Sequence, residues 1–335
     1  MSDAIKFTRA DVLHAAVGIL PAFPLVALGH LTPGVAFIIG LLPTSLMGIA
    51  PRRRLRVVYG LVGCLFGVGI LVGATINSTH VPVVSAALFF LICLGATMLA
   101  ATRPAGAVLL GILIPSLGVG TGYEVERAAA LMVAFMAGSI WSCLIMLPVH
   151  EFEGDPNALQ RLRAMQPPHT KTYGVLLGLT AATAILVGAL FDIPYAGWIA
   201  TAALLVIRPV QQMTGWRGIG RALSTIAGTL LVMLTLHLHL GYLATAIACS
   251  VVAILTIGAR TSKLYITSFG TAFLILTIEL HQVSSTADVH QVGRYRIGNN
   301  VLGAAIALFF GLLVSWLLER FYFGRRVTAR PDSAA

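Results

Sequence analysis

Long apolar runs follow one another along almost the entire chain, and they constrain its fold more than any other feature. Hydrophobic residues make up 58% of the 335 residues and charged residues only 10%, whereas soluble domains carry about 25% charged residues. A helix of about 20 apolar residues is long enough to cross a bilayer. The sequence therefore predicts an integral membrane protein and excludes a water-soluble fold.

The apolar runs predict an all-α fold of about twelve transmembrane helices with short connections. The runs fall at residues 11–29, 31–50, 57–76, 81–100, 104–120, 127–149, 172–190, 193–210, 219–237, 241–259, 264–281 and 297–319. So many helices leave no room for a large soluble domain.

The basic residues predict how the chain is oriented in the membrane. If both termini are cytoplasmic, 19 of the 22 Lys and Arg residues fall on the inner side, and only Arg127, Arg294 and Arg296 fall outside. Cytoplasmic loops carry such an excess of Lys and Arg. We therefore expect a multi-pass protein of the cytoplasmic (inner) membrane, and we attribute the net charge of +10 to topology rather than to nucleic-acid binding.

A charged connection at residues 150–171 divides the chain into two halves of six helices, 1–149 and 172–319, followed by a basic cytoplasmic tail at 320–335. A shift of 165 residues aligns Arg56 with Arg221 and Gly63 with Gly228. Because each half has an even number of helices, the two copies are predicted to be parallel repeats related by an axis along the membrane normal.

Cofactor, metal and nucleotide sites are not predicted. The four cysteines lie inside apolar runs without a C-x-x-C pair, and the histidines lack the spacing of zinc ligands. No Walker loop, zinc-protease motif or nucleophile elbow is present. The sequence therefore favours neither an enzyme nor an ATP-driven pump.

One segment of the second half carries a resemblance to a known family. The run RPVQQMTGWRGIGRALSTIAGTLL begins at Arg208, and the later run RIGNNVLGAAIALFFGLLVSW begins at Arg296. Together they resemble the fusaric acid resistance-like superfamily, which includes bacterial aromatic carboxylic acid exporters and is similar to plant malate channels. Ser224 stands where that family usually has Gly. The resemblance implies six-helix units, transport of organic anions, and a role for Arg221 within the family motif.

The predicted substrate site lies where the second helix of each half is interrupted by proline. Under the same shift, Arg208-Pro209 aligns with Pro43-Thr44. Paired broken helices are the best sequence sign of a transport site, and Arg presents a planar fork that matches a carboxylate. An alternative is that Arg208 only anchors its helix at the interface. The site residues are predicted to be Arg208 as carboxylate ligand, with Gln211, Gln212, Thr44, Ser45 and Arg221.

Other polar residues leave alternatives open. Arg52, Arg53, Arg54, Arg56 and Arg217 could join Arg221 in a ring at the cytoplasmic mouth, or could reflect topology alone. Asn299 and Asn300 could line a path or bond neighbouring helices.

Energy coupling is a separate open point. No Asp or Glu lies at mid-depth in the predicted helices, and Glu279 falls near a helix end. A proton shuttle at His14 is less favoured than a structural role.

The function predicted is export of organic, aromatic carboxylate anions, with proton coupling implied by the resemblance alone. A passive anion channel and a non-transporting membrane scaffold remain alternatives. The expected partners are a small organic anion and membrane lipid. A second copy of the chain or an adaptor protein could also bind, and the sequence does not decide between them.

Overall fold

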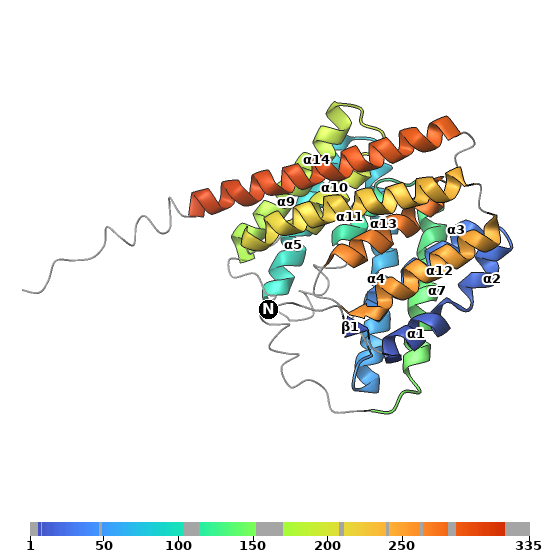
Figure 1. Ribbon diagram of the computed structural model, residues 1–335. Helices are drawn as coiled ribbons and strands as arrows, with labels where there is room; N and C mark the ends of the chain where they lie inside the picture. Colours follow the sequence, from blue (N-terminus) through green and yellow to red (C-terminus); the bar gives the residue numbers. More distant parts are fainter. Residues whose placement is uncertain are drawn as a thin grey trace, which may run out of the picture.

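The computed structural model describes residues 6–7, 9–46, 49–102, 114–151, 170–207, 211–238, 241–260, 264–280 and 286–318. Within these ranges the chain is almost entirely helical, as predicted (Figure 1). One exception is a short antiparallel pair in which β1 (Lys6–Phe7) lies beside β2 (Ala259–Arg260), with Lys6 opposite Arg260. This pair places Lys6 and Phe7 beside the end of the apolar run at 241–259.

Helices form in every apolar run. Their bounds are α1 (Arg9–Ile19), α2 (Ala22–Ala27), α3 (Leu31–Leu46), α4 (Arg53–Asn77), α5 (Pro82–Thr102), α7 (Val125–Met146), α9 (Thr170–Leu190), α10 (Gly197–Val206), α11 (Gln211–His237), α12 (Tyr242–Gly258), α13 (Leu264–Leu280) and α14 (Thr286–Leu318). The run at 104–120 is described only in its last part, where residues 114–120 are helical.

Four boundaries differ clearly from the sequence expectation, and one of them is the start of α11, which lies at Gln211 rather than at 219. The first run is divided into α1 and α2 at Leu20–Pro21, where proline removes a backbone donor. α10 has only 10 residues and ends at an extended Ile207, just before Arg208. α14 begins at Thr286 rather than at 297, so a polar segment predicted as an outer loop is helical. Because α14 begins at Thr286, Arg296 lies within this helix and not in a loop before it.

Five described helices are long and apolar enough to cross a membrane. They are the segments Arg53–Asn77, Pro82–Thr102, Val125–Met146, Thr172–Leu190 and His290–Leu313. α3, α10, α12 and α13 are shorter apolar helices. These helices agree with a multi-pass membrane protein, while the number of twelve complete crossings stays a prediction.

Helix packing follows the small residues. α7 packs against α3 and α4, and α14 packs against α10 and α11. A Cβ on Gly138 of α7 would overlap the Phe37 carbonyl of α3, and a Cβ on Gly303 of α14 would overlap the Ile199 carbonyl of α10. Glycine at these positions lets backbones approach closely, as is common between membrane helices. α5 and α9 form a further close pair between the two halves.

Contacts between helix ends define two ends of the molecule. At one end, Arg56 at the start of α4 bonds carbonyls at the end of α7, and we call this the Arg56 end. At the other end, the Asn77 amide donates to the Thr121 carbonyl at 3.0 Å, just before α7. Glu279 also lies there, so we call it the Glu279 end. α10 begins at the Glu279 end, and nearly all its residues are buried.

Candidate functional site

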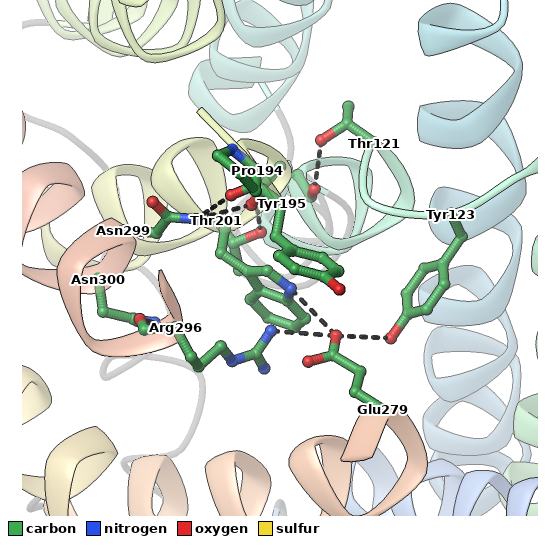
Figure 2. Close-up of polar contacts among 12 residues, drawn as sticks. Thr121, Tyr123, Pro194, Tyr195, Thr201, Glu279, Arg296, Asn299 and Asn300 are labelled. Atoms are coloured by element: carbon green, nitrogen blue, oxygen red, sulfur yellow. Dashed lines mark hydrogen bonds and ion pairs between the residues drawn. The ribbon is translucent and has the colours of Figure 1, made fainter. Parts of the chain in front are cut away.

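A buried polar cluster lies at the Glu279 end, where four elements meet (Figure 2). The turn before α7 provides Tyr123, α10 provides Trp198, α13 provides Glu279 and α14 provides Arg296. Oε1 of Glu279 accepts the Tyr123 hydroxyl at 3.3 Å and the Trp198 indole N–H at 3.1 Å. It also accepts an N–H of the Arg296 guanidinium at 3.2 Å. Three donors from three elements therefore converge on one carboxylate oxygen.

Positive charge is in excess in this cluster. The side chains of Arg296 and Glu279 are only 3% and 9% exposed. The Arg296 guanidinium lies over the Trp198 ring, and the Arg127 guanidinium lies 5.2 Å from the centroid of the Tyr123 ring. The Nε atoms of Arg127 and Arg296 are buried and have no hydrogen-bond partner in the described part of the chain. The Arg296 guanidinium thus faces the Glu279 carboxylate, the Arg127 guanidinium lies over the neighbouring Tyr123 ring, and each arginine has an Nε donor left over.

Tyr123 is a donor in this arrangement. Burial raises the pKa of its phenol above the ordinary value, and the nearby Glu279 carboxylate raises it further. The hydroxyl therefore keeps its proton and donates a hydrogen bond to Glu279.

Asn299 and Asn300 hold the neighbouring backbone. The Asn299 amide donates to the Pro194 and Tyr195 carbonyls at 2.9 and 3.0 Å, which fixes the turn leading into α10. The Asn300 amide donates to the Arg296 carbonyl at 2.8 Å in its own helix, while its buried Oδ1 has no partner among the described residues. Asn299 therefore bonds neighbouring elements, which is one of the two roles weighed from the sequence.

A cavity of about 370 Å³ lies beside the cluster. Its polar wall includes Asn77, His80, Thr121 and Tyr195. The wall shares two chain segments with the cluster, because Gly122 precedes Tyr123 and Gly197 precedes Trp198. Its volume is at the lower end of the range for small-molecule sites.

The structure describes part of the set of residues predicted from the sequence to bind substrate. Arg208 lies outside the described residues. Gln211 and Gln212 begin α11, Arg221 lies later in it, and Thr44 and Ser45 lie in the last turn of α3. Only their backbone belongs to the described structure, so the predicted site remains a prediction. Pro43 lies inside α3, which continues past it to Leu46.

Arg56 has a structural role that the sequence did not indicate. Its side chain is fully buried, and its guanidinium donates to the carbonyls of Ala50 at 2.7 Å, Met146 at 3.0 Å and Leu147 at 3.4 Å. It also bonds the carbonyls of Pro51, Val149 and His150. Arg56 therefore caps the carboxyl end of α7 and does not belong to an open ring at the mouth. Arg52, Arg53 and Arg54 are exposed.

His14 is held within the protein. Its Nε2 lies 3.0 Å from the Ser142 hydroxyl of α7, and both side chains are buried. This contact supports the structural role that the sequence analysis favoured over a proton shuttle. No group of His, Cys, Asp and Glu in the described ranges is placed to hold a metal ion.

The buried cluster was missed because its members look unremarkable in the sequence. Glu279 is next to a helix end, and Arg296 falls in a polar stretch that resembles an outer loop. A helical period through residues 286–300 is the signal that could have found it, since Val292, Arg296, Asn299 and Asn300 share one buried face.

The comparison with protein families concerns the part of the chain that contains most of this cluster. Residues 181–310 match the family described as fusaric acid resistance protein-like. The match confirms the resemblance predicted from the sequence. It includes Trp198, Glu279 and Arg296, whereas Tyr123 and Arg127 lie before it. No curated protein and no solved structure matches the chain. The fusaric acid resistance-like region and the apolar helices together support a multi-pass membrane protein of the transporter and resistance type.

Proposed function

We propose that this protein is a transporter of the cytoplasmic membrane that exports organic anions, with aromatic carboxylates as the substrate class. The observation that carries the proposal is the buried Arg296–Glu279 pair, beside which the Arg127 guanidinium lies over Tyr123, with the Nε atoms of both arginines left without a partner among the described residues. Cations inside a membrane protein are costly, and they usually mark a substrate or ion pathway. Unpartnered Arg N–H groups in such a place favour an anionic ligand, and a carboxylate fits the planar fork of Arg.

The aromatic part of the substrate class has separate support. Trp198 and Tyr123 form part of the cluster itself, and Tyr195 lines the adjacent cavity. The exposed Tyr195 ring offers an apolar face for an aromatic body, whereas the Trp198 and Tyr123 rings are buried against the guanidinium groups beside it. The family resemblance points to the same class.

The cluster around Trp198 lies at the beginning of α10, and the predicted Arg208 site follows the last residue of α10 in the sequence, two residues later. A helix of 10 residues is about 15 Å long, which is roughly half the thickness of the hydrocarbon layer. We propose that the anion passes along α10. It enters at Arg208, with Gln211, Gln212, Thr44, Ser45 and Arg221 at the cytoplasmic mouth, and leaves near Arg296.

The packing of the helices favours the proposed repeat. α7 contacts α3 and α4 in the same manner as α14 contacts α10 and α11. Two glycines at these crossings, Gly138 and Gly303, are separated by the same 165 residues as Arg56 and Arg221. We therefore propose two parallel six-helix repeats, 1–149 and 172–319. The linker 150–171, the tail 320–335 and both termini would be cytoplasmic.

Flux in liposomes tests the function. Purified protein is reconstituted, and transport of benzoate and malate is measured with a pH gradient and then with a voltage alone. Uphill flux in a pH gradient is expected for a coupled exporter. Current that follows voltage and never runs uphill would mean a passive channel. Absence of flux under both conditions would contradict the proposal.

Substitutions test whether anion flux depends on the cluster around Glu279. Arg296→Gln alone leaves the Glu279 charge buried and unpaired, so the informative variant is Arg296→Gln with Glu279→Gln, which removes both charges together. We expect this double variant to fold and to lose flux. Arg294→Gln is the matched control, because Arg294 is an exposed arginine of the same helix. Arg208→Gln is expected to abolish flux without lowering the folded yield.

The scaffold alternative is tested by deleting part of the linker 150–171. A transporter keeps its flux after this deletion, whereas a scaffold that binds its partner through the linker loses its cellular role.

A further inference from the structure

We propose that Glu279 is a built-in competitor for the transported anion. Its carboxylate accepts the hydrogen bonds that the transported anion would accept. Binding of the anion therefore requires Glu279 to separate from Arg296. Protonation of Glu279 promotes this exchange. The inference rests on the proposed anion transport and adds to it the residue that controls access to the site.

The geometry of the donors supports this exchange. The Tyr123 hydroxyl, the Trp198 indole and the Arg296 guanidinium all converge on Oε1 of Glu279, at distances between 3.1 and 3.3 Å. All three groups act here as donors, and they come from three different elements (Figure 2). A free carboxylate needs the same set of donors. The structure thus presents a carboxylate site whose present occupant is a side chain of the protein.

Glu279 receives no support from its own helix. It is the last residue but one of α13, where the helix dipole places partial negative charge. The carboxylate is therefore stabilised by groups from other elements and disfavoured by its own helix end. Replacing such a carboxylate with a competing anion costs less free energy than replacing a carboxylate that also accepts hydrogen bonds from its own helix.

The charge balance of the cluster is the same before and after the exchange. With Glu279 ionised, the cluster holds one carboxylate, paired with Arg296, and the Arg127 guanidinium lies over the neighbouring Tyr123 ring. With Glu279 protonated and a monoanion bound, the cluster again holds one negative charge beside the same arginines. A proton and a monoanion enter together as a neutral pair, so a buried site of low dielectric does not oppose the exchange.

The described groups that contact Glu279 are hydrogen-bond donors from other elements. They are the Tyr123 hydroxyl, the Trp198 indole and the Arg296 guanidinium, and the Arg127 guanidinium lies over the Tyr123 ring. The other helices packed on α13 bring exposed side chains to this end, namely His237 from α11 and Tyr242 from α12. α3, which also packs on α13, contains no titratable residue.

The test measures anion binding by the full-length protein in detergent. The probe is benzenesulfonate, which stays ionised across a series from about pH 5 to pH 8, and its affinity is determined by calorimetry. For the wild type we expect affinity to rise as the pH falls. For Glu279→Gln we expect binding about tenfold tighter at neutral pH, with most of the pH dependence lost.

Glu126→Gln is the matched control, because Glu126 is an exposed carboxylate in the first turn of α7, one residue from Arg127. This variant is expected to keep the affinity and pH dependence of the wild type. Equal affinity and equal pH dependence in Glu279→Gln and wild type would overturn the proposal.

Folding of the variant offers a second measurement. If Glu279→Gln is unstable because Arg296 loses its partner, added benzenesulfonate should restore its Tm, since the anion replaces the missing carboxylate. No gain of Tm with the anion would also overturn the proposal. Wild-type protein that transports anions but binds the probe equally at every pH would refute the role of Glu279 alone. Wild-type protein with neither flux nor binding would refute the transport function as well.

Discussion

Single residues in this protein are stabilised by partners that lie far apart in the sequence. Arg56 is the clearest case, because its guanidinium meets carbonyls from Ala50–Pro51 and from the end of α7. A shorter side chain at this buried position leaves those carbonyls unsatisfied. We expect Arg56→Gln to lower the free energy of unfolding by about 3 kcal/mol, measured as a lower Tm in detergent.

Arg54→Gln provides the control, since Arg54 is an exposed arginine of the same helix. Its Tm should match that of the wild type. An unchanged Tm in Arg56→Gln would mean that the carbonyls are satisfied without the guanidinium, and that Arg56 is available for another role.

The sequence distinguishes Arg56 from the neighbouring arginines, but it does not indicate what the Arg56 side chain does. Its alignment with Arg221 is visible in the sequence, whereas four of the six carbonyls that it bonds belong to residues 90 to 94 positions away. Glu279 and Arg296 were missed for a related reason. Each is ordinary in its own segment, and only the packing of α13, α14 and α10 makes them buried partners.

Helices in this protein approach each other closely where one of them has glycine. The carbonyl of Gly40 in α3 accepts the Ser139 hydroxyl of α7 at 2.6 Å, and a Cβ on Gly40 would overlap the Phe135 backbone. We therefore expect Gly40→Ala to push α3 and α7 apart and to reduce both Tm and folded yield. The expected effect is backbone displacement, because the opposing atoms cannot rotate away.

Gly95 of α5 is the matched position, because a Cβ there would have no described atom within 4 Å. Gly95→Ala should leave Tm unchanged or raise it slightly, as alanine favours helix formation by about 1 kcal/mol. A loss of stability in both variants would show that helix flexibility, rather than close packing, explains the glycines.

The positions of the helices were predictable to within a few residues for most apolar runs, because hydrophobicity determines them directly. The start of α14 was not, since Val292, Arg296, Asn299 and Asn300 bury one face of a polar segment that precedes most of the apolar run. The short length of α10 was not predicted either. Its apolar run continues to 210, but the backbone becomes extended at Ile207, next to Arg208-Pro209.

The charge asymmetry and the positions of the helix ends together predict how the whole molecule is oriented in the membrane. Arg54 lies at the Arg56 end and Glu124 at the Glu279 end, and both are exposed. The positive-inside rule places the Arg56 end in the cytoplasm, because the Arg-rich segment 52–56 is there. The two residues should therefore be accessible from opposite sides of the membrane.

Single cysteines test this orientation after the four native cysteines, Cys64, Cys93, Cys143 and Cys249, are replaced. Glu124→Cys should react with a membrane-impermeant maleimide in intact cells, and Arg54→Cys should react only in inverted vesicles. Labelling of both from one side would contradict the arrangement of α4 and α7 across the membrane. Labelling with the two sides exchanged would keep that arrangement but reverse the orientation, so that the cluster around Glu279 would face the cytoplasm and receive the anion first.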